Sequence, residues 1–203
     1  MPLQAVIFDI GGVLIRTEDL EPRRQWERRF SLAEWGLADL VFNCPASRRA
    51  SVGQATPEDV WAEVMRHLSL TPSELESLKA DFWKGDVWDE RLIGFIRSLR
   101  PRLKTGIISN AWSDVRENVK AHVNGDSFDV ILFSAEEGIE KPDPEIYRRA
   151  LARLDVAPAD AVFVDDMPVN VEAARALGMM GVHFQPGIDV RTELEKVTCH
   201  FFC

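Results

Sequence analysis

The sequence has few cysteines and no long apolar run. Three cysteines among 203 residues, Cys44, Cys199 and Cys203, are too few for a disulfide framework. An odd number without a basic, signal-like N-terminal segment is typical of reduced thiols in the cytoplasm. No apolar stretch approaches the roughly 20 residues that span a bilayer. We therefore expect a cytoplasmic protein without a membrane partner, whose Cys199–Cys203 segment packs on the core or on a neighbouring subunit rather than binding a metal.

Basic residues are also in deficit. The chain has 24 Lys and Arg against 33 Asp and Glu, a net charge of −9. Proteins that bind nucleic acid usually carry a basic surplus, so we expect no such partner. A locally positive site can still bind a small phosphorylated substrate on an acidic protein. Only six of the 24 basic residues are lysines, so a lysine within a motif stands out.

Short apolar runs alternate with helical patterns along most of the chain. Runs rich in Val, Ile and Phe without polar alternation are typical of strands buried on both faces of a parallel sheet. They occupy residues 4–10, 104–109, 128–133, 161–165 and 180–184. Helical patterns occupy residues 113–123, 144–154 and 169–177. The alternation predicts an α/β fold with a Rossmann-like parallel sheet and right-handed crossovers.

The interval between the first two predicted strands is unusually long. It spans about 90 residues, far more than one crossover helix requires. Within it, Thr56–Asp59 and Thr71–Glu74 each place Thr, Pro and an acidic residue at the first positions of a helix. We therefore predict an α-helical cap at residues 16–88, inserted into a core made of residues 1–15 and 89–203.

Tryptophan is concentrated in this interval, which holds five of the six tryptophans. Residues 21–35 place Trp26 and Phe30 at helical spacing, which predicts one helix there. Most of these rings are expected to form the interior of the cap. The alternative is that one or two of them line a substrate pocket that faces the sheet.

Polar side chains stand at the ends of the predicted strands. Asp9 ends the first strand, Ser109 and Asn110 the second, and Asp165 and Asp166 the fourth. In open parallel sheets, ligands bind beyond the carboxyl ends of the strands. Three carboxylates placed there repel one another unless a divalent cation or protons offset their charge. Oxygen ligands without His or Cys favour Mg²⁺.

One lysine stands in a loop after the third predicted strand. Lys141 lies in the sequence EKPDP, where two prolines restrict the backbone and present the side chain rigidly. Its compact positive charge suits a phosphate oxygen or an anionic intermediate.

Four segments in this order resemble the motifs of the haloacid-dehalogenase-like (HAD) superfamily, in its branch with a helical cap. They are FDIGGVL around Asp9, ISN ending at Asn110, KPDPEIY from Lys141, and VFVDDMPVNVEAARALGM. The resemblance implies a hydrolase in which Asp9 attacks phosphorus and forms an aspartyl-phosphate that water then hydrolyses. It also implies a set of phosphate-binding residues: Ser109, Asn110, Lys141 and, through backbone amides after the nucleophile, Gly12.

The same resemblance implies a magnesium site. Asp9 and Asp166 would bind Mg²⁺, together with the backbone carbonyl of Gly11 and with Asp165 directly or through water. A metal at this place holds the transferring group and stabilises its charge. Asn170, one helical turn further on, would orient the acidic loop.

Gly11 departs from the family pattern, because family phosphatases usually have an Asp there that protonates the leaving group and activates water. Such acid–base catalysis contributes about 10²–10⁴-fold. The first interpretation is a phosphatase whose substrate has a good leaving group, or whose acid is Glu18, Asp19 or water. The second is a 2-haloacid dehalogenase, which the intact acidic pair disfavours. The third is a catalytically weak protein with a binding or regulatory role, although every other site residue is present.

Substrate selection is expected to come from the cap. Arg16 follows the first strand, and Arg48 and Arg49 lie in a segment that resembles the site-facing cap loop of related proteins. Their guanidinium groups could pair with a second phosphate or a carboxylate of the substrate. The sequence thus favours a Mg²⁺-dependent phosphatase for a small phosphorylated metabolite such as a sugar phosphate. It gives no indication of the oligomeric state.

Overall fold

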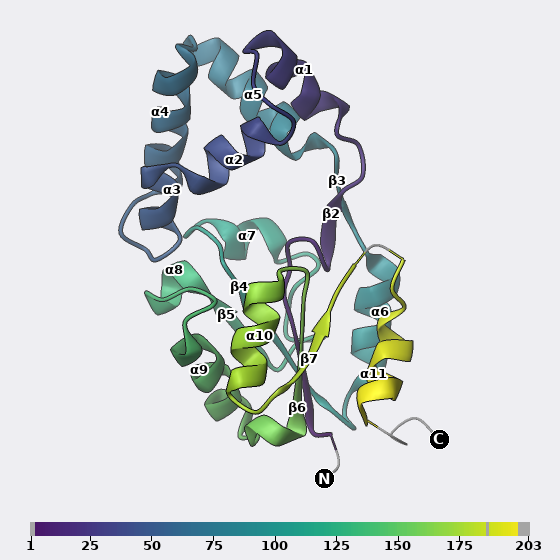
Figure 1. Ribbon diagram of the computed structural model, residues 1–203. Coiled ribbons are helices and arrows are strands. Elements are labelled where there is room, and N and C mark those ends of the chain that lie inside the picture. Colours follow the sequence, from purple (N-terminus) through teal and green to yellow (C-terminus); the bar gives the residue numbers. More distant parts are fainter. Residues whose placement is uncertain (1–2, 186, 199–203) are drawn as a thin grey trace.

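A five-stranded parallel sheet forms the centre of the protein. The computed structural model describes residues 3–185 and 187–198, and the sheet has the strand order β5-β4-β1-β6-β7 (Figure 1). The strands are β1 (Ala5–Phe8), β4 (Lys104–Ser109), β5 (Val130–Phe133), β6 (Ala161–Asp165) and β7 (Met180–His183). The predicted Rossmann-like α/β fold is confirmed. The Cys199–Cys203 segment lies outside the described residues.

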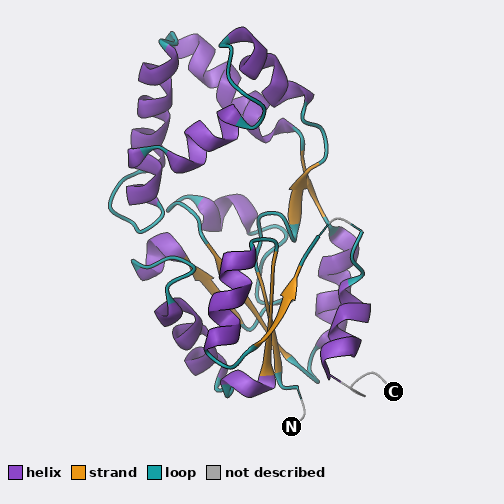
Figure 2. Ribbon diagram, in the orientation of Figure 1, coloured by secondary structure: helices purple, strands orange, loops and turns teal. Residues whose placement is uncertain are grey.

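Helices cover both faces of this sheet (Figure 2). Val6 and Phe8 pack on the face covered by α6 and α11, whereas Ala5 and Ile7 pack on the face covered by α9 and α10. All four side chains are fully buried, which explains why the strand is apolar throughout instead of alternating with polar residues. The core helices are α6 (Glu90–Leu99), α7 (Val115–Val119), α8 (Ser134–Glu137), α9 (Pro144–Leu154), the 3-10 helix η1 (Pro158–Asp160), α10 (Pro168–Ala176) and α11 (Val190–Thr198). Among the described residues, no helix is both long and apolar enough to cross a membrane.

Five helices between β1 and β4 form a separate bundle over the carboxyl end of the sheet (Figure 1). They are α1 (Glu21–Arg29), α2 (Gly36–Asn43), α3 (Pro45–Ala50), α4 (Pro57–Leu68) and α5 (Pro72–Lys84). We call residues 18–85 the helical insertion. Two short antiparallel strands, β2 (Ile15–Thr17) and β3 (Asp86–Trp88), connect it to the rest of the chain.

The insertion has an apolar interior of its own. Trp26 and Trp61 are buried in it, whereas Trp35 and Trp83 are 52% and 45% exposed, so the expectation that most of the tryptophans form this interior is wrong. Trp88 lies on β3, outside this bundle. The tryptophans therefore divide into buried rings that stabilise the bundle and exposed rings that need a different explanation.

Both predicted capping motifs are confirmed. At the start of α4, Thr56 Oγ1 accepts a hydrogen bond from Asp59 N at 3.2 Å, and Asp59 Oδ2 accepts one from Thr56 N at 2.9 Å. Thr71 and Glu74 form the same pair of bonds at the start of α5, at 3.3 and 2.8 Å. These bonds satisfy backbone donors that have no partner within the helix.

The first helix of the insertion is shorter than the sequence predicts. The pattern predicts a helix over residues 21–35, but α1 ends at Arg29. Ser31 adopts φ +52°, Ser31 N donates to Arg28 O, and Leu32 N donates to Glu27 O at 2.9 Å. This is the Schellman arrangement, in which the left-handed residue is usually glycine. A serine at that position leaves no clear stop signal in the sequence.

The segment after β4 also differs from expectation. Residues 113–123 have a helical pattern, but α7 extends only over Val115–Val119. Beyond it, His122 N and Val123 N both donate to Val119 O, at 3.0 and 2.8 Å. The Val119 carbonyl thus accepts two hydrogen bonds where the helix ends, and the chain continues from there toward β5.

Candidate active site

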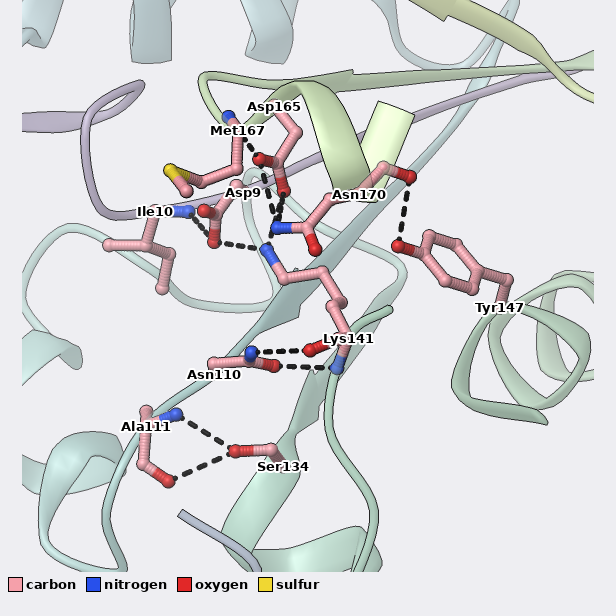
Figure 3. A network of polar contacts seen from close by, with 10 residues as sticks. All are labelled: Asp9, Ile10, Asn110, Ala111, Ser134, Lys141, Tyr147, Asp165, Met167 and Asn170. Carbon is pink, nitrogen blue, oxygen red and sulfur yellow. Dashed lines mark hydrogen bonds and ion pairs between the residues drawn. The ribbon is translucent and has the colours of Figure 1, made fainter. Parts of the chain in front are cut away.

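The strand order brings the predicted polar strand ends together. Because β1 lies between β4 and β6, Asp9, Ser109 and Asp165 leave three adjacent strands at the same edge of the sheet. These residues are only 8%, 5% and 0% exposed. Figure 3 shows the carboxylates of Asp9 and Asp165 converging on Lys141, which comes from the loop before α9. The Ser109 hydroxyl has no hydrogen-bond partner among the described residues, so it is available to a ligand oxygen.

Lys141 is a buried cation between two carboxylates. Its Nζ lies 2.8 Å from Asp9 Oδ1 and 2.7 Å from Asp165 Oδ2, and its side chain is 1% exposed. Asn110 fixes the backbone of this lysine, because Asn110 Oδ1 accepts from Lys141 N at 2.8 Å and Asn110 Nδ2 donates to Lys141 O at 2.9 Å. The Asn110 side chain therefore positions the lysine, while its expected part in phosphate binding stays a prediction.

Asp165 is hydrogen-bonded at both carboxylate oxygens. Its Oδ1 accepts from Met167 N at 2.8 Å, its Oδ2 accepts from Lys141 Nζ, and Asn170 Nδ2 lies 3.1 Å from both oxygens. Tyr147 OH donates to the backbone oxygen of Asn170 at 3.0 Å and so supports the same turn (Figure 3). Because Asp165 is fully buried and well supplied with donors, its contacts are those of a residue that orients Lys141.

Asp9 has one occupied and one free carboxylate oxygen. Oδ1 accepts from Ile10 N at 2.7 Å and from Lys141, whereas Oδ2 has no hydrogen-bond partner among the described residues. Burial raises the pKa of Asp9 to about 6, although Lys141 lowers it, and Asp165 adds to the increase. At neutral pH this carboxyl group is therefore mostly ionised, and a charged oxygen is free to act as a nucleophile or as a metal ligand.

A third carboxylate completes an acidic cluster. Oxygens of Asp9, Asp165 and Asp166 lie within 4.8 Å of one another. Burial, and then the charge of Asp165, raise the pKa of Asp166. Three carboxyl groups share one lysine here, so their negative charge exceeds the positive charge of Lys141 when all three are ionised. An all-oxygen donor set with excess negative charge fits a small, hard divalent cation such as Mg²⁺. His183 Nε2, 2.9 Å from Asp166 O, holds the backbone of this loop.

Two glycines with opposite surroundings form the turn after Asp9. Gly12 has φ +72°, and a Cβ there would lie 2.2 Å from Asp166 Oδ2, so only glycine lets the turn approach the acidic loop. The Gly12 amide donates to Ile15 O at 2.9 Å, so its expected part in phosphate binding stays a prediction. Gly11 is exposed, and a Cβ there would meet no atom of the described residues within 4 Å. The position that carries an acid in family phosphatases is thus open space.

The two candidate replacement acids lie at the start of the insertion. Glu18 and Asp19 are both exposed. Asp19 Oδ1 accepts from Glu21 N at 2.9 Å, and Glu18 N donates to Gly85 O at 2.9 Å. The contacts of Asp19 are those of a helix start, and a catalytic role for either residue stays a hypothesis.

Arg16, the first of the three arginines expected to select the substrate, already has partners within the chain. It donates to Val13 O at 2.7 Å and to Asp89 Oδ2 at 2.8 Å. The bond to Asp89 connects β2 to the N-cap of α6. A role for Arg16 in substrate binding therefore requires that it exchange an ion pair for the ligand.

The other two arginines are exposed on the insertion. Arg48 and Arg49 lie on α3, which ends at Ala50. Ser51 Oγ hydrogen-bonds to Glu140, the neighbour of Lys141. This end of the insertion therefore touches the loop that carries the buried lysine of the site, and the specificity role of both arginines stays a prediction.

Sequence reasoning missed a serine that supports the site. Ser134, fully buried, accepts a hydrogen bond from Ala111 N at 2.9 Å and donates one to Ala111 O at 3.2 Å (Figure 3). It holds the loop that begins at Ser109. The only available signal was its place directly after a strand, since β5 ends at Phe133.

The chain belongs to the haloacid dehalogenase-like hydrolase family, whose model matches residues 3–178. It is therefore a hydrolase, and the family resemblance drawn from the four motifs is confirmed.

Similar proteins include enzymes with different activities. The sesquiterpene phosphatase astK of Aspergillus oryzae is 29% identical over 199 residues, which cover 96% of both chains. The bifunctional epoxide hydrolase 2 of Sus scrofa is 33% identical over 219 residues, which cover 98% of this chain but only 39% of that protein. A HAD family enzyme of Bacteroides thetaiotaomicron, solved with magnesium and inorganic phosphate, has the same fold, with a TM-score of 0.76 at 19% identity over 92% of this chain and 96% of that one.

Proposed function

We propose that this hydrolase is a Mg²⁺-dependent phosphatase that cleaves a small phosphorylated metabolite through an aspartyl-phosphate on Asp9. The observation that carries the proposal is the state of Asp9, a carboxylate with one free oxygen and with its other oxygen held by Lys141. A nucleophile must present a lone pair while its remaining charge is stabilised. Asp9 meets both conditions at the carboxyl end of the central strand.

The reaction has two displacements at phosphorus. Asp9 Oδ2 attacks phosphorus, the bond from phosphorus to the ester oxygen breaks, and the alcohol leaves with a proton. Water then attacks the aspartyl-phosphate, which releases inorganic phosphate and restores Asp9. Lys141 and the free Ser109 hydroxyl would bind phosphoryl oxygens, and Asp165 would keep Lys141 aligned through both displacements.

Asp9, Asp166 and the Gly11 carbonyl are the groups that would hold Mg²⁺. When bound, the metal supplies charge stabilisation to the transferring phosphoryl group. The fit rests on the excess negative charge of the cluster and on its oxygen donors. Asp165 would contribute mainly through Lys141 and Asn170, because its oxygens already accept hydrogen bonds.

The relatives support this proposal. One that aligns over almost its full length is named for phosphatase activity, and a structural neighbour was solved with magnesium and inorganic phosphate. Gly11 leaves open space where an acid would contribute about 10²–10⁴-fold to the rate. We therefore propose that the natural leaving group needs little protonation, or that Glu18, Asp19 or water supplies the proton.

Phosphate release from p-nitrophenyl phosphate tests the proposal. We expect turnover that requires Mg²⁺, disappears with a chelator and returns on adding the metal. Asp9→Asn should reduce kcat by about 10³-fold or more. Asp126→Asn, an exposed carboxylate outside the site, is the matched control and should keep wild-type kinetics.

Three results would contradict the proposal. Asp9→Asn with wild-type activity would exclude the nucleophile. Halide release from 2-chloropropionate without metal would identify a dehalogenase. No turnover over a panel of sugar phosphates, nucleotides and phospho-acids, together with tight binding of phosphate analogues, would favour a binding role.

A further inference from the structure

Five aromatic rings gather where the insertion meets the core. We call Phe42, Trp61, Phe82, Trp83 and Trp112 the aromatic face. Ring centroids lie 5.4 Å apart for Phe42–Phe82, 6.0 Å for Phe42–Trp83, 5.8 Å for Trp61–Phe82 and 4.8 Å for Phe82–Trp83. Phe82 is fully buried and Trp61 is 7% exposed, whereas Phe42 and Trp83 are each 45% exposed. The inner rings are core residues, and the outer two present an apolar surface to solvent.

Trp112 shows which way this surface points. It lies in the core, on the loop that follows β4, yet its ring centroid is 6.1 Å from those of both Phe42 and Trp61. Its indole Nε1 donates to Ser47 Oγ at 3.2 Å. Phe42 and Trp61 therefore lie where the insertion meets the core. Figure 1 shows the insertion, α2 and α5 included, over the carboxyl ends of the strands.

The aromatic face also begins close to the phosphate-binding residues. Trp112 is three residues after Ser109, and three residues span at most about 11 Å between Cα atoms. A molecule whose phosphate lies between Ser109 and Asp9 therefore needs an apolar group only a few bonds long to reach Trp112. A longer group continues along Phe42 to Trp83.

Exposed aromatic rings in mutual contact differ from single exposed side chains. Trp35 is 52% exposed, but it has no ring contact among the described residues, and isolated apolar residues are common on protein surfaces. Large contiguous apolar patches are uncommon on soluble proteins and mark binding sites. Here Phe42 contacts Trp112, which lies three residues after Ser109, so the exposed rings begin close to the candidate phosphate site and the substrate is the occupant we favour.

We propose that the aromatic face binds a hydrocarbon portion of the substrate, so that the natural substrate is a phosphate ester of an apolar alcohol. This inference rests on the proposed phosphatase function. It differs from the expectation of a sugar phosphate, because the exposed surface offers rings, and the indole N–H of Trp112 already has a partner in Ser47. The phosphate would be held by core residues and the hydrocarbon by the insertion.

A substrate series with constant leaving-group chemistry tests the inference. Phenyl, 4-butylphenyl and 4-hexylphenyl phosphate have nearly equal phenol acidity, so kcat/KM reports the tail alone. Burying methylenes should raise kcat/KM about tenfold or more from phenyl to 4-hexylphenyl. In the double variant Phe42→Ala/Trp83→Ala this ratio should fall to within about twofold of one. Trp35→Ala, an equally exposed tryptophan outside the face, should keep the wild-type ratio.

The outcomes separate this inference from the proposed function. Asp9-dependent turnover without dependence on tail length, or a higher kcat/KM for glucose 6-phosphate than for 4-hexylphenyl phosphate, would overturn the inference and leave the phosphatase intact. If no phosphate ester turns over, the test is the binding affinity of ethylphosphonate and of hexylphosphonate, measured by calorimetry in the presence of Mg²⁺. A hexylphosphonate preference of tenfold or more that the double variant loses would support the aromatic face, and equal affinities would overturn it.

Discussion

The core and the insertion differ in which side chains have unusual burial: charged side chains are buried in the core, and aromatic side chains are exposed on the insertion. In the core, the ion-paired Lys141 and Asp165 side chains are 1% and 0% exposed, although burying charge is unfavourable without partners. In the insertion Arg23 and Glu27 are also buried, but three large aromatic side chains are 45–52% exposed, those of Trp35, Phe42 and Trp83. The unusual residues of each region thus agree with the role that we propose for it. Buried ion pairs serve the phosphate chemistry of the core, and exposed rings serve apolar binding by the insertion.

The largest effect should come from removing the buried cation of the core. Lys141→Met leaves Asp9 and Asp165 without their shared partner, which should lower the free energy of unfolding by about 3–5 kcal/mol. The measurement is urea unfolding at neutral pH without added metal. Phosphatase activity should be lost in the same variant.

Arg23→Met is the matched change in the insertion. Arg23 pairs with Asp86 at 2.9 Å, with side-chain exposures of 8% and 11%, and donates to Phe82 O at 2.6 Å. Asp86 keeps a 2.6 Å hydrogen bond from Thr17, so the loss should be nearer to about 2 kcal/mol. A loss as large as that of Lys141→Met would break the comparison, because it would mean that the insertion depends on buried charge as strongly as the core.

A smaller effect should distinguish the two glycines beside the nucleophile. Gly12→Ala places a methyl group against Asp166 in a left-handed conformation, so it should destabilise the chain by about 1–3 kcal/mol and reduce activity. Gly11→Ala enters open space and should change stability by no more than about 0.5 kcal/mol. Thermal unfolding and p-nitrophenyl phosphate turnover measure both. Equal effects would show that the acidic loop is free to move away from the turn.

The sequence predicts the sheet, and it predicts that Asp9, Ser109 and Asp165 lie together at one edge of it. Strands buried on both faces require continuous apolar runs, and parallel strands bring Asp9, Ser109 and Asp165 to one edge. Lys141 stood out because lysine is scarce and two prolines surround it. These signals are short and local, so they can be recognised without knowing how distant segments pack.

Other features depend on contacts that the sequence does not encode locally. The helix α1 ends at a serine in the left-handed conformation, Ser31. A glycine at this position would have indicated the helix end in the sequence. The contact of Trp112 with Phe42 depends on how the insertion meets the core. The same is true of Ser134, whose bonds to Ala111 join two loops. Long-range packing therefore decides what surrounds the site, although local motifs decide what the site contains.

The smallest effect is expected for Glu74, a surface carboxylate of the insertion. It tests how much an exposed charge contributes to stability there, compared with the buried charges of the core. Glu74 accepts hydrogen bonds from the Thr71 backbone, from Arg29 and from the Thr71 hydroxyl, which lower its pKa from 4.5 to about 2. The unfolded chain therefore takes up this proton at a higher pH than the folded chain does. The resulting stabilisation is fully present above pH 4.5 and is lost as the pH falls toward 2.

Glu74→Gln should therefore be less stable than the wild type at pH 6, and the difference should shrink between pH 4.5 and 3 in urea unfolding. Glu76→Gln on the same helix removes only an exposed pair with Lys79 and should lie close to the wild type at pH 6. A Glu74→Gln deficit that stayed constant with pH would show that the helix cap, not the charge, stabilises this part of the insertion.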